Sequence, residues 1–478
     1  MKKTVIRICL VGFALISLLA CLLCYYGLDR VPYGFHVDEL SSAVDIGCMS
    51  TEGVDAHNTR YPVFSNLNYG TPKPPTYLYP GIVWAKVFGY SVPSLRAYSV
   101  TVYFLGIAGL FFLAHLLFGW RYAFLTMTVA SLSPWTWILC RTAFESLFAM
   151  TFIIWGLYFF LRPVKAWSTV LAGLFFSAAM YSYPPFRLQT PLMLLSLGFY
   201  AWKAQPRSPG LWALFISAVL IPGIPLFQRI LSGELQQRFN LISIFSKDYL
   251  TSIHRSGSLK DLAEVFISNF FVHFRADFLF TKGDPYLIHS TRHFGILSWM
   301  DMAGLCFAAV LLILLFIKKG RGENPIVSQK YFLFFLFSNI LIGVIPSALT
   351  TDLPNSLRII GSWPFMCLFS GFFLWQLCER WWTGWIITLV LSVLFAVSFF
   401  KVYFEVYPQE SKGFFSFWTL EQANKAKTDR DWLKFVEIYR YQDYNARYFL
   451  MQNRGLTCTQ SRNLWEGMRD FLKARGQY

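Results

Sequence analysis

Long runs of apolar residues dominate the chain and predict membrane-spanning helices. The first run, residues 8–28, contains no Asp, Glu, Lys or Arg. A helix needs about 20 such residues to cross roughly 30 Å of hydrocarbon. The run ends in Cys24, Tyr25 and Tyr26 rather than in the small residues of a signal-peptide cleavage site. We therefore expect a retained helix here.

Further apolar runs bring the expected number of transmembrane helices to about eleven. They cover residues 97–118, 122–139, 146–161, 166–183, 188–202, 210–228, 294–317, 331–349, 359–377 and 382–400. Residues 74–89 are left out because they open with two prolines and contain Lys86, so a helix at or dipping into the interface is expected there. The pattern predicts an all-α polytopic membrane protein.

Basic residues in the short loops set the orientation, because cytoplasmic loops retain Lys and Arg. With the N-terminus inside, alternation of the spans puts the following residues on the cytoplasmic face: Lys2, Lys3, Arg7, Arg121, Arg162, Lys165, Lys203, Arg207, Lys318, Lys319, Arg321 and Lys330. The outer regions are then residues 29–96, short loops at Arg141 and Arg187, residues 230–293 and the tail.

The tail marks a second domain, because the sequence becomes charged and polar after Lys401. We expect a transmembrane domain over residues 1–401, with long outer loops at 29–96 and 230–293, and a small extracytoplasmic C-terminal domain over 402–478. Helical pieces are expected at 420–427 and 463–474 within that domain. Long loops in compact proteins usually carry function, so the first outer loop is the place to seek chemistry.

Composition supports a lipid environment and excludes a nucleic-acid partner. Only 14% of the residues are charged and 55% are hydrophobic, whereas soluble domains carry about a quarter charged residues. The net charge of +16 comes without a basic, aromatic-interleaved stripe in a soluble domain. The nine cysteines are scattered, mostly in apolar segments, without metal-ligand spacing, so we interpret them as small hydrophobes.

Two adjacent acids, Asp38 and Glu39, follow the first span by a few residues. At the membrane surface they could hold a general base against a substrate whose lipid tail lies in the bilayer. Taken alone, such a pair in a loop is more often solvated and idle. Further along, Lys73 lies between prolines that hold the backbone extended. This lysine suits a lipid phosphate at headgroup depth, and ordinary snorkelling is the equal alternative.

The order of these features resembles the membrane glycosyltransferases of the GT-C superfamily. Within it, the likeness is to the protein O-mannosyltransferase and aminoarabinose transferase group, the glycosyltransferase 39 type. The motifs run through nearly the whole chain: Asp38-Glu39, Lys73-Pro74-Pro75, Phe88-Gly89, Leu95-Arg96-Ala97-Tyr98-Ser99, Ser133-Pro134-Trp135, Arg141 to Glu145, Gly283-Asp284-Pro285, Arg292-His293-Phe294-Gly295, Pro346 to Leu349, Asn355 to Arg358 and Pro364. One departure is Pro72, because aminoarabinose transferases have Glu directly before the lysine.

The resemblance implies a GT-C fold and transfer of a sugar from a polyprenyl-phosphate donor, with inversion, at the outer face of the plasma (inner) membrane. By that likeness Asp38 and Glu39 are the catalytic candidates, and Lys73 contacts the lipid phosphate. The leaving phosphate is already anionic, so it needs charge stabilisation rather than a general acid. Asp38 would take the proton of the acceptor hydroxyl. The acceptor would be a glycan, lipid or protein, the other partners are membrane lipids, and no cofactor is expected.

Other outer-face residues are secondary candidates. Arg358 is a second possible phosphate ligand, with snorkelling as the alternative. Candidate substrate-binding residues are Arg141, Glu145, Asp284, Arg292 and His293. Arg141 with Glu145 could equally be an ion pair at the membrane edge. His289, His293 and Asp284 fall in an outer loop, where no helix would bring residues four apart to one face. We therefore assign no metal ligands.

Two other classes of protein share part of this pattern. A transporter or lipid flippase has similar spans and a similar excess of Lys and Arg. In that class, however, functional charged residues are expected at the middle of the bilayer. Here the ionisable residues gather at the outer boundary. A non-catalytic envelope assembly protein predicts tolerance of Asp38→Asn and Lys73→Ala, which an enzyme does not.

Overall fold

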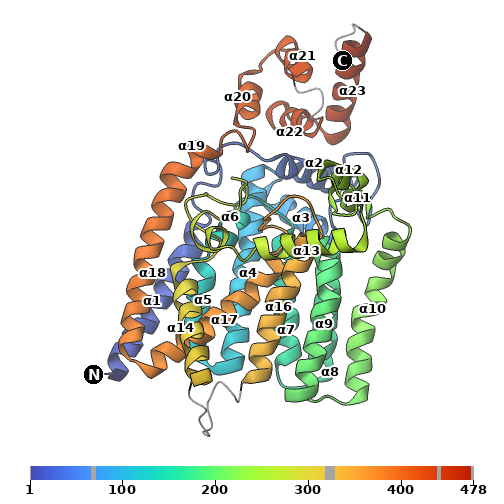
Figure 1. The fold of residues 1–478 in the computed structure, drawn as a ribbon. Coiled ribbons are helices and arrows are strands. Elements are labelled where there is room, and N and C mark those ends of the chain that lie inside the picture. Colours follow the sequence, from blue (N-terminus) through green and yellow to red (C-terminus); the bar gives the residue numbers. More distant parts are fainter. Residues whose placement is uncertain (1, 66–71, 318–328, 439–442, 475–478) are drawn as a thin grey trace. The chain divides into compact units, whose positions relative to one another are not determined.

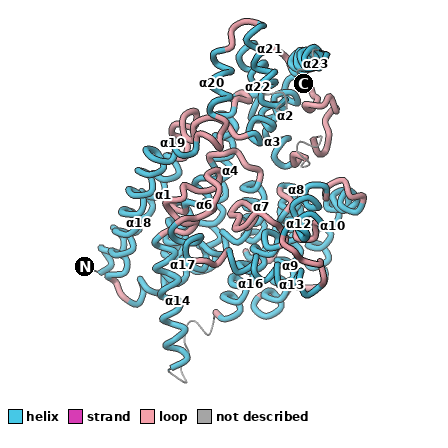
Figure 2. Tube along the Cα trace, turned by 45° about the horizontal axis from the view of Figure 1, so that its top comes forward, coloured by secondary structure: helices cyan, strands magenta, loops and turns pink. Residues whose placement is uncertain are grey.

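The computed structural model describes residues 2–65, 72–317, 329–438 and 443–474. The predicted cytoplasmic residues Lys318, Lys319 and Arg321 lie outside these ranges. Within the described ranges the regular elements are helices joined by loops, with no strand (Figure 2). Isolated bridges pair Val54 with Arg60 and Ser243 with Thr350. The all-α fold class is confirmed.

A helix, or a bent pair of helices, lies at each predicted apolar run. These elements are α1 (Lys2–Leu23), α4 (Val92–Phe118), α5 (Trp120–Ser131) with α6 (Pro134–Cys140), α7 (Ser146–Leu161), α8 (Ala166–Ser182), α9 (Pro185–Ala204), α10 (Pro209–Leu231), α14 (Trp299–Ile317), α16 (Lys330–Ala348), α17 (Trp363–Arg380) and α18 (Thr383–Lys401). Among the described residues, six helices are long and apolar enough to cross a membrane, or seven if the bent pair is one span. A multi-pass membrane protein is confirmed, and the count of about eleven spans stays a prediction.

The remaining helices belong to the outer loops and the tail. They are α2 (Val37–Thr51), α3 (Pro75–Phe88), α11 (Gln237–Ile242), α12 (Lys247–Ser252), α13 (Leu259–Val272), α19 (Tyr407–Ser411), α20 (Phe417–Lys425), α21 (Asp429–Ile438), α22 (Asp443–Arg454) and α23 (Cys458–Ala474), with short η1 (Asp277–Thr281), η2 (Ile360–Ser362) and η3 (Val402–Val406). The stretch 74–89 forms the helix α3, and its place at the membrane interface stays a prediction. In the tail, the expected helical piece at 420–427 overlaps α20, which ends at Lys425, and the piece at 463–474 lies within α23.

Two compact units make up the chain. Unit 1 comprises residues 1–24, 102–138 and 146–402, and unit 2 comprises residues 25–101, 139–145 and 403–478. The expected boundary at 401/402 falls next to the point where the chain leaves unit 1. The tail therefore shares unit 2 with the first outer loop, because the two pack through the contacts described below.

Unit 1 is a bundle of apolar helices with buried polar bonds at its breaks. Helix α1 runs beside α18 and packs Phe13 against Trp385 (Figure 1). At the bend between α5 and α6, Pro134 cannot donate a backbone hydrogen bond. Next to this bend, the Ser133 hydroxyl accepts a hydrogen bond from Trp363 Nε1 at 3.1 Å. Helix α13 lies across the end of α16, where Asn269 Nδ2 donates to the Ala348 carbonyl at 3.2 Å (Figure 1).

Unit 2 is tied together by a disulfide between Cys48 of α2 and Cys458 of α23, 410 residues apart in sequence. Beside it, the Glu52 carboxylate accepts hydrogen bonds from the Thr459 backbone N–H at 3.1 Å and from its hydroxyl at 2.5 Å. The interpretation of all nine cysteines as small hydrophobes is therefore wrong for this pair. The pairing depends on tertiary contact between distant segments, which cysteine spacing does not reveal.

The disulfide predicts a specific loss of stability. Cys458→Ser should lower the free energy of unfolding by about 2–4 kcal/mol, because the cross-link no longer restrains the unfolded chain. Thermal unfolding in detergent would measure it. Cys306→Ser, at an exposed free cysteine, is the matched control and should change little. Maleimide labelling of both Cys48 and Cys458 in the untreated protein would contradict the cross-link.

Candidate active site

A capping box at the start of α2 fixes the position of Asp38. His36 is the N-cap, and its Nδ1 accepts a hydrogen bond from the Asp38 backbone N–H at 3.3 Å. In return the Glu39 carboxylate accepts from the His36 backbone N–H at 2.7 Å. These reciprocal bonds satisfy backbone donors that the first turn of a helix leaves free. Asp38 is thus held in the first turn, where the helix dipole favours a negative charge.

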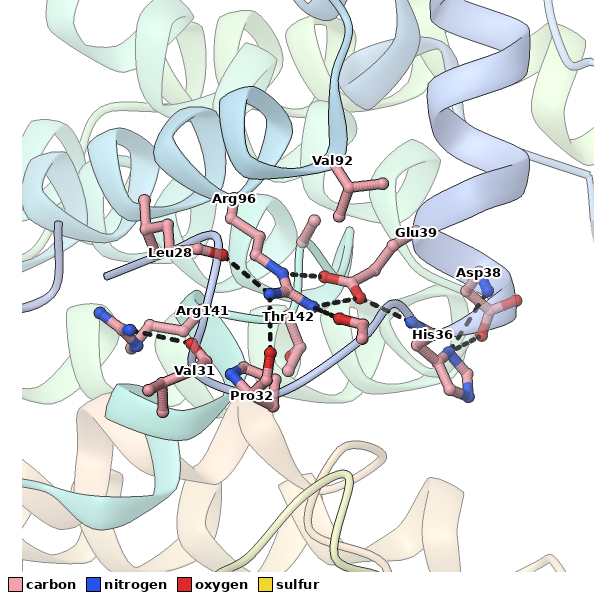
Figure 3. A network of polar contacts seen from close by, with 12 residues as sticks. Leu28, Val31, Pro32, His36, Asp38, Glu39, Val92, Arg96, Arg141 and Thr142 are labelled. Atoms are coloured by element: carbon pink, nitrogen blue, oxygen red, sulfur yellow. Dashed lines mark hydrogen bonds and ion pairs between the residues drawn. The ribbon is translucent and has the colours of Figure 1, made fainter. Parts of the chain in front are cut away.

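Glu39 forms a fully buried ion pair with Arg96 of α4 (Figure 3). Arg96 Nε donates to Glu39 Oε1 at 2.7 Å, and Nη2 donates to Oε2 at 2.8 Å. The same guanidinium donates to the carbonyls of Leu28, Pro32 and Gly34 at 2.9, 3.2 and 2.9 Å. Because its donors are distributed in this way, Arg96 joins the chain after α1 to the start of α2.

Removing one charge of the Arg96–Glu39 pair should lower the stability of the fold. Glu39→Gln leaves the buried Arg96 guanidinium uncompensated, so we expect the free energy of unfolding to fall by about 3–5 kcal/mol. Glu379→Gln breaks the exposed Arg121–Glu379 pair and should cost less than about 1 kcal/mol. Unfolding of both variants in one detergent makes the comparison. Equal losses would show that the buried pair is not a special constraint.

Asp38 and Lys73 lie side by side, and Asp38 is the exposed member of the pair. The Asp38 side chain is 45% exposed and that of Lys73 is 5% exposed, with Lys73 Nζ 3.9 Å from Asp38 Oδ1. The ammonium also donates to the Asp38 backbone carbonyl at 3.4 Å. Upstream of α3, the Lys73 backbone N–H donates to the Ser65 hydroxyl at 3.2 Å. The sequence-predicted base and phosphate ligand therefore meet.

Lys73 lies among acidic groups. Burial by itself lowers the pKa of the Lys73 ammonium, but the carboxylates of Glu145, Asp38 and Asp45 outweigh burial and raise that pKa. Glu145 is only 9% exposed, and burial raises the pKa of its carboxyl group although Lys73 opposes the shift. The site therefore presents one open carboxylate, a charged lysine and two buried acids behind them.

Asp45 is the most strongly shifted of these acids. Burial raises its pKa from 3.8 to about 7, against a hydrogen bond from the Ala56 backbone N–H; Asp55 raises the pKa further and Lys73 lowers it. Asp45 lies two helical turns after Asp38, so both acids project from one side of α2.

This shift predicts a pH dependence of stability. Between about pH 4 and pH 7 the folded chain keeps a proton on Asp45 that the unfolded chain releases, so the free energy of unfolding falls as pH rises, by up to about 1.4 kcal/mol per pH unit. Asp45→Asn should remove that decline and be the more stable form above pH 7. Unfolding measured from pH 4 to 8 tests it, with the exposed Asp470→Asn as control. An unchanged slope in Asp45→Asn would contradict the assignment.

Arg141 braces unit 2 from the short outer loop. It is fully buried, with Nε donating to the Tyr403 hydroxyl at 3.0 Å and Nη2 donating to the Val31 carbonyl at 2.9 Å (Figure 3). Its guanidinium also stacks over the rings of Tyr403 and Phe404, 5.3 and 5.5 Å from their centroids. These contacts favour the structural alternative over a sugar contact for Arg141.

The other sequence candidates lie in unit 1. Asp284 is buried, and its carboxylate accepts from the Ser356 backbone N–H and hydroxyl at 2.7 and 2.9 Å and faces His289 Nδ1 at 3.3 Å. Burial alone raises the pKa of Asp284, but His289 and the hydrogen bonds lower it overall. Arg358 Nη2 pairs with Asp352 at 2.9 Å.

Arg292 and His293 lie further along the loop that contains Asp284 and His289, and both residues are exposed. Their backbone N–H groups donate to the hydroxyls of Ser290 and Thr291 at 2.8 and 3.3 Å. Within the described ranges, no group of three or more His, Cys, Asp and Glu could hold a metal ion.

Sequence reasoning missed three residues of the site: His36, Asp45 and Arg96. Asp45 carries a usable signal, because seven residues separate it from Asp38 and a helix brings such positions to one face. Arg96 stands in one of the motifs given above and His36 lies two residues before Asp38, yet their roles depend on which groups the fold brings to them. No spacing rule connects Arg96 with Glu39.

Two kinds of solved structure, of ArnT and of an oligosaccharyltransferase, match most of this chain. ArnT from Cupriavidus metallidurans, bound to undecaprenyl phosphate, matches with 14% identity over 96% of this chain and 75% of that chain, at a TM-score of 0.48. The oligosaccharyltransferase AglB from Archaeoglobus fulgidus, in complex with an inhibitory peptide and a dolichol-phosphate, matches with 13% identity over 92% of this chain and 59% of that chain, at a TM-score of 0.45. No protein-family model and no curated protein matches the chain. These TM-scores lie below 0.5, so we argue the function from the geometry of the site itself.

Proposed function

We propose that the protein is an inverting glycosyltransferase that moves a sugar from a polyprenyl-phosphate donor to an acceptor hydroxyl at the outer face of the membrane. The observation that carries this proposal is the half-exposed Asp38 carboxylate held 3.9 Å from the buried Lys73 ammonium. A base and a cation side by side serve the two charges that change in the reaction: the proton leaving the acceptor and the phosphate leaving the donor.

Asp38 is the proposed general base. The capping box and the Arg96–Glu39 pair hold it at the start of α2, so little reorganisation is needed when an acceptor hydroxyl approaches. The acceptor oxygen attacks the anomeric carbon, its proton goes to Asp38, and the bond from that carbon to the phosphate oxygen breaks with its electron pair. A single displacement of this kind inverts the anomeric centre.

Lys73 is the proposed partner of the departing phosphate. Its neighbouring carboxylates raise its pKa, so it stays charged throughout the physiological pH range. The phosphate of a polyprenyl donor lies at headgroup depth, where an ammonium carried by a proline-bounded segment can reach it. Lys73 then stabilises the anion that develops as the glycosidic bond breaks.

Glu39 takes a positioning role instead of the catalytic role that the sequence suggests. Both of its carboxylate oxygens are engaged by Arg96 in a fully buried pair, and one also accepts from the His36 backbone. Protonating it would break the pair that locates α2. Asp38 therefore remains the only one of the two adjacent acids that we assign to proton transfer.

The outer face is supported by two independent features of the chain. The Cys48–Cys458 disulfide joins the helix that carries Asp38 to the tail, and disulfides persist in oxidising compartments rather than in the cytosol. Basic loop residues put the first outer loop and the tail on the same side by alternation of the spans. We accordingly place the active site on the extracytoplasmic side of the plasma membrane.

Substitutions of Asp38 and of Lys73 should reduce sugar transfer in different ways. Asp38→Asn should lower kcat by about 10²- to 10⁴-fold, because the base is lost. Lys73→Gln should also raise KM for the donor, because the phosphate loses its counter-charge. The assay follows label from a panel of radiolabelled polyprenyl-phosphate sugars into acceptors in membranes with matched expression.

Asp29→Asn is the matched control, since Asp29 is an exposed acid of the same outer loop, and it should transfer at the wild-type rate. Retention of the disulfide confirms that each variant is folded. If wild type transfers no sugar from any donor while Asp38→Asn still supports the cellular phenotype, the transporter alternative replaces the enzyme.

A further inference from the structure

The residue that caps α2 is an unusual choice. Asn, Asp, Ser and Thr are the preferred N-cap residues because a short side chain accepts from the first free backbone donors. Here His36 occupies the position and accepts from the Asp38 backbone N–H through Nδ1. Capping alone does not require an imidazole, and the contacts of the His36 ring indicate a second role.

The imidazole also faces the side chain of the proposed base (Figure 3). His36 Nδ1 lies 3.5 Å from Asp38 Oδ2, while Lys73 lies nearer Oδ1. The His36 ring packs edge-on against Phe144 and Phe415, with centroids 5.8 and 6.4 Å away. Two aromatic neighbours and the backbone bond therefore hold Nδ1 towards the carboxylate.

The hydrogen bond at Nδ1 identifies the tautomer. A ring nitrogen that accepts from a backbone N–H carries no proton, so a neutral His36 bears its proton on Nε2. The single lone pair of Nδ1 is engaged by the Asp38 backbone N–H at 3.3 Å, and a negatively charged oxygen of Asp38 lies next to it at 3.5 Å. Such a contact is unfavourable while Asp38 is ionised and becomes favourable once Oδ2 carries a proton to donate.

We propose that His36 is a positioning residue that acts through Asp38: after Asp38 has taken the acceptor's proton, Nδ1 exchanges its 3.3 Å bond from the backbone N–H for a hydrogen bond from the adjacent Asp38 carboxyl group. This inference rests on the proposed function. The acceptor O–H bond breaks, an O–H bond forms on Asp38, and that proton is shared with Nδ1 until it passes to water. Because the neutral carboxyl is stabilised, Asp38 becomes a stronger base.

The charge state of His36 then controls the rate. Among the described contacts, the ring faces Asp38, the His36 backbone N–H is bonded to Glu39, and Lys73 and Glu145 interact with Asp38. The flanking Phe144 and Phe415 are uncharged. A proton added to Nδ1 at low pH turns the acceptor into a donor to ionised Asp38. This change stabilises the carboxylate, weakens the base and slows transfer.

The test compares pH profiles of sugar transfer for wild type, His36→Asn and His57→Asn. Asparagine keeps a side-chain cap on α2 but removes the ring. His57 contacts the Tyr444 hydroxyl in the same unit and serves as the matched control for loss of an imidazole. His36→Ala removes the cap as well as the ring, and should unfold at a lower temperature than His36→Asn.

Wild type and His57→Asn should lose activity as pH falls within the range in which histidine ordinarily titrates, about pH 5 to 8. His36→Asn should be slower at pH 7.5 by up to about 10-fold, the upper limit for a fall of roughly one unit in the pKa of the base, and should lack that acid limb. A folded His36→Asn with the wild-type rate and limb overturns the inference. No transfer by wild type at any pH instead overturns the proposed function, so the two failures are distinguishable.

Discussion

The buried Arg96–Glu39 pair is the constraint on which the site depends. Two charges taken out of water are stable only when nearly every donor and acceptor is used, and the pair meets that condition through the carbonyls of Leu28, Pro32 and Gly34. The geometry leaves little freedom for the start of α2. A capping box built on Glu39 then places the neighbouring acid, Asp38, at the edge of solvent.

The adjacent carboxylates of Asp38 and Glu39 lie in different surroundings, and this difference assigns them different proposed roles. Glu39 is enclosed and neutralised by a guanidinium, whereas Asp38 is half open, with a lysine on one side and an imidazole on the other. A base must be reachable and must change its charge, which the enclosed acid cannot do without breaking its ion pair. Sequence adjacency therefore says little about shared function, because each side chain leaves the helix in its own direction.

The C-terminal helices are part of the unit that holds the proposed active site. The disulfide to Cys48, the bonds from Thr459 to Glu52, and Arg447 donating to the Ala56 carbonyl all connect the tail to the chain around α2. These bonds add to the apolar packing of the loop, in which Leu40, Val44 and Ile46 of α2 are also buried. The helix that carries the proposed base is thereby tied to the tail.

The sequence by itself determined the class of fold, the positions of the apolar helices and the likeness that points to Asp38 and Lys73, because hydrophobic period and local motifs are written along the chain. It also located α3 and two helices of the tail. Only the tertiary structure decided that Glu39 belongs to Arg96, that Cys48 bonds Cys458, that Arg141 is a brace, and that Asp45 and Glu145 stand beside Lys73. Those choices depend on burial and on contacts between distant segments, and neither is encoded in local spacing.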